Sequence, residues 1–396
     1  MGYKLHRGRR KMFRKRGRVG KVLLSVLLAA VIVAGGFFGT KYLMEHPVAR
    51  PDDGSSISDS STPSLPDSAD DTPSQPDTVD VAQSVVGLYL PDAALHDLDA
   101  LGVTLAQAKA AGFDSVIFDM KDADGRLYFR SASEQAAQVD AFTETALTAE
   151  QLTALFDTVR RAGMNAVPRL FAFCDNAAAR ALPGARITPQ GNPSWVWYDG
   201  VPGKGGKAWL NPYADEARLY VIGLARELCE SGATAVLFDG VQFPRQVGEA
   251  NFGTSADANL SRAEILTEFI TEARTLLGSK HPVLLACSGE SALGEKTQVY
   301  GGNPLTFGAD IAVPCFTPVA TGEQTLREAV SADVHQCDTR IKVIEGDRPL
   351  LSPMLTVDGL TAEQLREAVD GRRESGGKAL ILYAADGKYD LSALAG

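Results

Sequence analysis

The stretch from residue 207 to residue 244, KAWLNPYADEARLYVIGLARELCESGATAVLFDGVQFP, decides the fold. Apolar residues between 219 and 228 recur with the 3.6-residue period of a helix, and Gly232 stands where the C-terminal cap is expected. A short apolar run at 235–238 comes next and stops at Asp239. A run without polar alternation predicts a strand covered on both faces of a parallel sheet. Folds of this class place their chemistry at the carboxyl ends of such strands.

The alternation of strand and helix continues on both sides of this stretch. Further strands are predicted at 84–90, 115–119, 165–173, 283–287, 310–315, 350–355 and 378–383. Further helices are predicted at 101–111, 148–162, 261–277, 324–332 and 361–375. Repeated βα units over about 310 residues predict an α/β fold, a closed (β/α)8 TIM barrel. An open doubly wound sheet is the alternative, but no G-x-G-x-x-G follows the first strand.

The N-terminal region differs in charge from the rest of the chain. Residues 1–44 contain eleven Lys or Arg and no acidic residue. The segment VLLSVLLAAVIVAGGFFGT at 22–40 is apolar and uncharged, close to the ~20 residues that cross a bilayer. We predict a transmembrane helix at 22–40 behind a basic cytoplasmic arm at 1–21, because positive charge favours the cytoplasmic side. A cleaved signal peptide is the alternative.

Residues 41–83 are rich in Ser, Pro, Asp and Thr and contain almost no large apolar residue, which predicts a disordered linker. The barrel at 84–396 is therefore expected to be an extracellular domain of a single-pass protein of the cell membrane, with a cytoplasmic N-terminus. From residue 83 onward the chain has 27 basic and 40 acidic residues, a net charge of −13. An acidic domain of this kind argues against a nucleic-acid partner.

The cysteines show no pattern of a metal or redox site. They lie at 174, 229, 287, 315 and 337, without a C-x-x-C pair. We expect buried thiols, with one disulfide left open, and we predict no metal site. No Walker, H-E-x-x-H or EF-hand pattern is present, and the sequence predicts no cofactor.

Charged residues gather at the predicted carboxyl ends of the strands. Asp119 and Lys121 are two residues apart and are expected to share one face of their strand. Several carboxylates and two cations at one rim fit glycoside hydrolysis, which needs two carboxyl groups flanking the bond. The candidate catalytic residues are Asp239, Glu290 and Asp119, and the candidate substrate-binding residues are Lys121, Arg169 and Asp175.

Each of these residues also has a purely structural explanation. Asp119 and Lys121 fit an internal ion pair, and Arg169 fits a cation that neutralises barrel carboxylates. Asp239 before a glycine is compatible with a turn, and Glu290 with an exposed loop. The sequence leaves these alternatives open.

All three tryptophans fall in the loop between the strand at 165–173 and the following helix. Their aromatic faces would suit stacking against sugar rings. The alternative is that they pack the loop onto the barrel, and we favour this for Trp209. The candidate substrate-binding residues of the loop are Trp195, Trp197 and Tyr198.

Five segments together resemble DUF4015, a family of glycoside hydrolase-like domains. They are VVGLYL at 85–90, VIFDMKDADGRLYF at 116–129, VPRLFAFCD at 167–175, AWLNPY at 208–213 and FDGVQFP at 238–244. The resemblance implies a TIM barrel related to polysaccharide-active enzymes. It implies as site residues Asp119, Lys121, Arg169 and Asp239.

The second half of the chain departs from this family pattern. Residues 286–290 read ACSGE, without an aspartate in register, and the segments at 314–319 and 348–353 lack expected amide and aromatic groups. We therefore hold two hypotheses. The first is a membrane-tethered glycosidase that acts on a polysaccharide or cell-wall glycan, with Asp239 as nucleophile or base and Glu290, or else Asp119, as proton donor. The second is a catalytically inactive barrel that binds glycan or serves as a scaffold.

Overall fold

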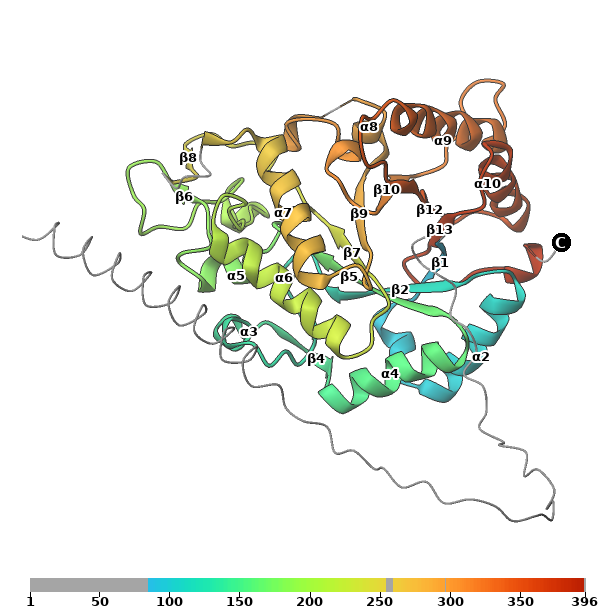
Figure 1. The fold of residues 1–396 in the computed structure, drawn as a ribbon, viewed down its shortest axis with the longest axis horizontal. Coiled ribbons are helices and arrows are strands. Elements are labelled where there is room, and N and C mark those ends of the chain that lie inside the picture. The colour runs from blue at the N-terminus through green and yellow to red at the C-terminus, as the bar shows by residue number, and fades with distance from the viewer. Residues whose placement is uncertain (1–84, 254–258, 296, 395–396) are drawn as a thin grey trace, which may run out of the picture. The chain divides into compact units, whose positions relative to one another are not determined.

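The computed structural model describes residues 85–253, 259–295 and 297–394 (Figure 1). The predicted arm at 1–21, transmembrane helix at 22–40 and linker at 41–83 lie outside these residues. Within the described ranges, no helix has the length and apolar character needed to cross a membrane.

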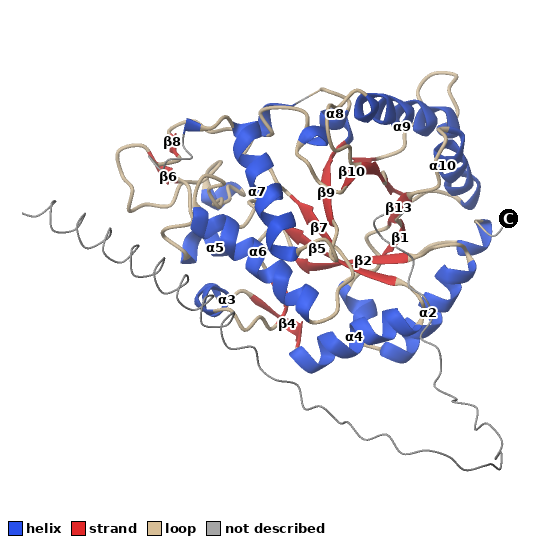
Figure 2. Ribbon diagram, viewed as in Figure 1, coloured by secondary structure: helices blue, strands red, loops and turns tan. Residues whose placement is uncertain are grey.

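Eight parallel strands form a closed barrel, drawn as the red ring of strands in Figure 2. Closure comes from Gly87, which pairs with Ile381 on one side and with Ser115 on the other. The predicted closed α/β barrel is therefore confirmed, and the open-sheet alternative is wrong. The barrel strands in order are β1 (Val86–Tyr89), β2 (Ser115–Lys121), β5 (Asn165–Phe171), β7 (Val236–Asp239), β9 (Val283–Ser288), β10 (Ile311–Phe316), β12 (Met354–Thr356) and β13 (Leu380–Tyr383).

Helices cover the outside of this barrel. Several begin at a capping box, in which the N-cap hydroxyl and the third helical residue bond each other's backbone amides; Ser261 and Glu264 form the one at the start of the helix that begins at Arg262. Gly232 follows the central helix at a positive φ of 121°, as its predicted cap position requires. The outer helices are α2 (Leu98–Ala110), α4 (Ala149–Arg161), α6 (Asp215–Glu230), α7 (Arg262–Leu277), α9 (Leu326–Lys342) and α10 (Ala362–Glu374).

Alternate residues of each strand point to opposite faces of the sheet and contribute to two different hydrophobic cores. One set packs between the strands and the helices, and the other fills the barrel interior. Because residues two apart share a face, every second residue of a strand faces the interior, up to the carboxyl end of that strand. The interior core includes Ile117, Val167, Leu237, Leu284, Val313 and Ile381.

The structure differs from the sequence prediction at the helix predicted at 324–332, which forms the longer α9, and at one strand. The strand predicted at 350–355 is interrupted by Ser352 and Pro353, because proline cannot donate to the ladder, and it forms β11 (Leu350–Leu351) and β12. The helix after β9 is only α8 (Gly289–Ala292). After β13 the described chain contains only the 3-10 turn η6 (Leu391–Ala393).

Two insertions build up the rim at the strand carboxyl ends. After β2 the chain forms β3 (Leu127–Phe129), α3 (Glu134–Val139) and β4 (Phe142–Leu147), which extend the sheet beyond β2. After β5 it forms α5 (Asn176–Ala181) and β6 (Thr188–Pro189), and β6 pairs with β8 (Ala250–Asn251) from the loop after β7.

Candidate active site

Arg169 is the central charged residue of the barrel interior. It lies on β5 directly beside Asp119 of β2, and these two residues are in register. Its Nε and Nη2 donate to the two carboxylate oxygens of Asp119 at 2.5 and 3.0 Å. Such a two-pronged contact fixes the geometry of both side chains. The Asp119 carboxylate also accepts a hydrogen bond of 3.0 Å from the Tyr89 hydroxyl.

Asp239 is the second carboxylate at this guanidinium. Its Oδ2 lies 3.6 Å from Nη1 of Arg169, while its Oδ1 accepts a 2.6 Å hydrogen bond from the Gly240 amide. Both carboxylates therefore contact one guanidinium at the carboxyl end of the barrel. The predicted convergence of Asp119, Arg169 and Asp239 is therefore what the structure contains.

Three aromatic rings surround the guanidinium. The Cζ atom of Arg169 lies 5.3, 5.1 and 5.2 Å from the ring centres of Tyr89, Phe171 and Tyr383. Cation–π contacts of this kind strengthen when water is excluded. Sequence reasoning missed Tyr89 and Tyr383; the signal was their place at the last interior positions of the first and last strands.

Burial raises the pKa of Asp239 above the usual range of a carboxyl group. The charge of Arg169 and the Gly240 amide act in the opposite direction, and the nearby charge of Asp119 raises the pKa further. A raised carboxyl pKa is the property that suits a general acid near neutral pH.

A β-bulge separates Lys121 from Asp119. Asp119 pairs with Arg169, whereas Lys121 pairs with Leu170, the very next residue of β5. One extra residue on β2 turns Lys121 away from the interior and toward the helices. The expectation that Lys121 and Asp119 share a face is therefore wrong.

Lys121 instead forms a fully buried ion pair with Asp175, at 2.8 Å. The Lys121 ammonium also donates to the Phe171 carbonyl, and Asp175 caps α5 by accepting from the Ala178 amide at 2.7 Å. Neither side chain has any exposed surface, so this structure offers neither to a substrate. Their predicted substrate contact needs correction for this reason.

Glu290 lies in α8 and lines a cavity of about 430 Å³ at the rim. The exposed Glu290 follows Ser288 at the end of β9, the strand that pairs with β7 and hence neighbours Asp239. Gln242, three residues after Asp239, lines the same cavity. The carboxylate predicted as a proton donor thus faces a cavity at the rim whose lining does not include Asp119, Arg169 or Asp239.

The tryptophan loop divides into an exposed and a buried part. Trp195 is 66% exposed, whereas Trp197 is 7% exposed and donates its indole N–H to the Gly248 carbonyl at 3.0 Å. Trp197 therefore anchors the loop, and the expectation that its face stacks on a sugar is wrong. Trp209 is buried as expected, although one side of it lines the rim cavity. The half-buried Tyr198 forms an isolated antiparallel β-bridge with Ala208.

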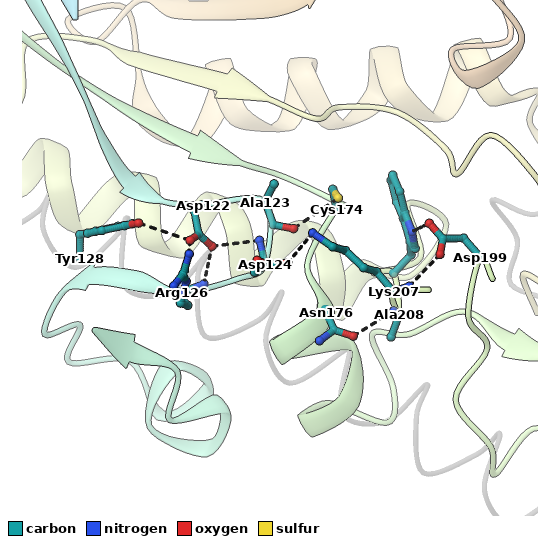
Figure 3. A network of polar contacts seen from close by, with 11 residues as sticks. Asp122, Ala123, Asp124, Arg126, Tyr128, Cys174, Asn176, Asp199, Lys207 and Ala208 are labelled. Carbon is teal, nitrogen blue, oxygen red and sulfur yellow. Dashed lines mark hydrogen bonds and ion pairs between the residues drawn. The ribbon is translucent and has the colours of Figure 1, made fainter. Parts of the chain in front are cut away.

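A polar network, drawn in Figure 3, joins the loops of the rim. Lys207 pairs with Asp124 of the β2–β3 turn at 2.5 Å, and its amide donates to Asp199 at 2.7 Å. Asp199 also accepts from the indole N–H of Trp209 at 2.9 Å. The network thereby fixes Asp199 and Trp209, two residues of the rim cavity. Asp122 organises the same turn by accepting from Arg126 at 2.7 Å.

In the described part of the chain, no three His, Cys, Asp and Glu side chains are arranged to hold a metal ion. All five cysteines are free thiols. Burial raises the pKa of Cys315, at an interior position of β10, to about 12, and the charge of Asp239 contributes. Cys315 is therefore a neutral thiol at neutral pH rather than a reactive thiolate.

We expect Lys121→Ala to destabilise the protein by about 3–5 kcal/mol, because it leaves the buried Asp175 carboxylate without its partner. Chemical denaturation of the full chain followed by circular dichroism measures this loss. The matched control is Lys342→Ala, which breaks an exposed pair with Asp338 on α9 and is expected to cost about 0–1 kcal/mol. Equal losses would contradict the structural role of Lys121.

Trp197→Ala and Trp195→Ala are expected to lower the stability of the protein to very different extents. Trp197→Ala removes a buried anchor and is expected to cost about 3–5 kcal/mol. Trp195→Ala removes an exposed ring and is expected to change stability by about 0.5 kcal/mol or less. The same denaturation measurement tests both, and a large loss for Trp195→Ala would show that its ring packs in solution.

Among solved structures, the chain is similar to a hypothetical protein from Ruminiclostridium thermocellum ATCC 27405, at 22% identity and TM-score 0.42, covering 50% of this chain and 96% of that one. It is also similar to a chitobiase from Flavobacterium johnsoniae (11% identity, TM-score 0.47, 78% and 47% coverage) and an α-amylase from Lactobacillus plantarum (12%, 0.48, 76% and 71%). The chain thus spans less than half of the chitobiase. No curated protein matches.

The family model described as "Putative glycosyl hydrolase domain", DUF4015, matches residues 87–292. This range covers β1 through α8 and contains Asp119, Arg169, Asp239 and Glu290. The family resemblance seen in the sequence is confirmed, as is the glycosidase-like character it implied. With more than half of its residues matched, the chain belongs to the DUF4015 family of glycosyl hydrolase domains.

Proposed function

We propose that the protein is a glycoside hydrolase in which Asp239 donates the proton to the leaving group. The observation that carries the proposal is the placement of Asp239 and Asp119 on one guanidinium at the carboxyl end of the barrel, with the pKa of Asp239 raised by burial. A carboxyl group that keeps its proton toward neutral pH is suited to protonate a glycosidic oxygen. This reverses the role that the sequence alone suggested for Asp239.

Asp119 and Arg169 act in this proposal as a charged pair that holds the site. Both oxygens of Asp119 accept hydrogen bonds from Arg169, which leaves this carboxylate poorly placed for nucleophilic attack. Its charge raises the pKa of Asp239, and it stands near the positive charge that develops on the sugar in the transition state. Asp119 is therefore an electrostatic partner of the reaction.

Glu290 supplies the second reacting carboxylate in this proposal, as base or nucleophile. Its exposed side chain lines the rim cavity together with Gln242, Gln298 and Ser288, whose polar groups suit sugar hydroxyls. Trp195 offers an exposed ring for a further sugar unit of a polysaccharide.

We further propose that the barrel acts on an external or cell-wall glycan while tethered to the cell membrane. Support comes from the amino-acid sequence of residues 1–83: a basic arm, an apolar segment at 22–40 and a polar linker. In this arrangement the N-terminus is cytoplasmic and the barrel is extracellular.

A glycan-binding protein without hydrolytic activity is the second candidate. The observation that favours it is that Asp119 is fully engaged by Arg169 and Tyr89, while Lys121 and Asp175 are buried in a structural pair. The rim then offers fewer reactive groups than its sequence suggests.

Asp239→Asn is expected to lower the release of reducing ends by about 100-fold or more, because it removes the proton donor. The full chain in non-ionic detergent is assayed against a panel of bacterial and plant polysaccharides, with binding measured in parallel. Asp157→Asn, on the exposed face of α4, is the matched control and is expected to be fully active. Binding without release by the wild-type protein would refute the enzyme and favour the second candidate.

The pH profile of kcat/KM separates an acid from a nucleophile at Asp239. As an acid, Asp239 must be protonated, so activity falls as pH rises through its raised pKa. Asp119→Asn removes a charge that raises this pKa and is therefore expected to move the alkaline limb to lower pH. If Asp239 were the nucleophile or base, the acidic limb would move instead.

A further inference from the structure

Among the described residues, no long helix lies between α10 and α2 in the ring of helices around the barrel. In most positions a strand is followed by a long helix, but β13 is followed in the described chain only by the single turn η6. Figure 1 shows this C-terminal end of the chain in red, near α10 and with α2 below it. At this place Val86 of β1 is only half-buried, whereas Leu88 and Leu380 are covered.

A cavity of about 470 Å³ lies between α10 and α2. Its lining includes Val86 and Leu380, which lie at the first positions of β1 and β13, so it opens at the amino end of the barrel. Asp239 ends its strand at the opposite rim. The cavity is therefore separate from the candidate active site. Its floor is apolar, and its walls carry three cations: Arg372, Arg373 and Lys378.

Arg372 is the unusual member of this set. It is 6% exposed, yet within the described residues it forms no ion pair. Asp338, whose charge acts on the pKa of Arg372, is itself paired with Lys342 at 2.6 Å. Burial lowers the pKa of Arg372 below the usual range of a guanidinium, as expected for a buried charge without a counter-ion.

The hydrogen bonds of Arg372 use only part of the donor capacity of its guanidinium. Nε donates to the Ala379 carbonyl at 2.7 Å and Nη1 to the Ser375 hydroxyl at 2.9 Å, which ties the end of α10 to the start of β13. Nη2 makes only a long contact of 3.5 Å, to the Leu351 carbonyl. A guanidinium has five donors, so further hydrogen bonds remain possible.

We propose that this cavity binds a phosphate group through Arg372 and Lys378. Lys378 also forms no ion pair with any described residue, whereas Arg373 pairs with Asp370 at 3.1 Å. Guanidinium and phosphate match in charge and in bidentate geometry, and a flexible ammonium complements them. The volume exceeds that of one inorganic ion, and the apolar floor suits the organic part of a phosphate ester. Soluble phosphate esters and phospholipid headgroups share this chemistry. The site is independent of glycoside hydrolysis.

The test measures thermal unfolding of the full chain in non-ionic detergent during titration with sodium phosphate. Sodium chloride at equal ionic strength is the reference. Phosphate is expected to raise the Tm in a saturable manner, because a ligand that binds only the folded state stabilises it. A Tm that follows ionic strength alone, identical in the two salts, would overturn the proposal.

Variants locate the effect without disturbing the fold. Lys378→Glu, at an exposed position, is expected to weaken the phosphate dependence at least 10-fold, because it replaces attraction by repulsion. Lys204→Glu, on an exposed turn that is distant in sequence from Lys378, is the matched control and is expected to leave the phosphate dependence unchanged. An equal loss of the phosphate dependence in both variants, or no loss in either variant, would place any phosphate binding elsewhere and refute this site.

Two further ligands distinguish the sources of the phosphate. Glycerol 3-phosphate represents a soluble ester, and dihexanoyl phosphatidylglycerol represents a headgroup with short acyl chains. Binding at least 10-fold tighter to the lipid, lost in Lys378→Glu, would identify a headgroup whose chains cover the apolar floor. Equal or tighter binding to glycerol 3-phosphate would identify a soluble ester.

Discussion

The contact of one guanidinium with two carboxylates inside the barrel is the interaction on which the candidate site depends. Arg169 enters the interior because it alternates with outward-facing residues of β5. A cation buried there needs partners, and Asp119 and Asp239 meet this need from the neighbouring strands. Removing Arg169 would leave the Asp119 carboxylate without its cation among Tyr89 and Tyr383.

The same requirement operates on the other side of β2, with a different outcome. The bulge before Lys121 directs this cation between the barrel and its helices, where Asp175 neutralises it without exposure to solvent. Two neighbouring charged pairs therefore serve different purposes. The interior pair with Asp119 lies at the open end of the barrel and raises the pKa of Asp239, whereas the outer pair holds α5 against the strands.

The two ends of the barrel are shaped by the connections between its strands. At the carboxyl end, the insertions after β2 and β5 add the network of Lys207, Asp124 and Asp199, which orders the rim. At the amino end, no long helix follows β13 in the described residues, and Arg372 lies there beside a cavity without an acidic partner among those residues.

The sequence by itself determined the α/β barrel, the family and the convergence of Asp119, Arg169 and Asp239, because strand period and strand ends are local properties of the chain. It could not determine which way Lys121 points, since a bulge depends on the register between two strands distant in sequence. Only the tertiary structure decided the burial of Trp197, the part played by Tyr89 and Tyr383, and the cavity beside α10. Each of these depends on which surfaces the folded chain leaves uncovered.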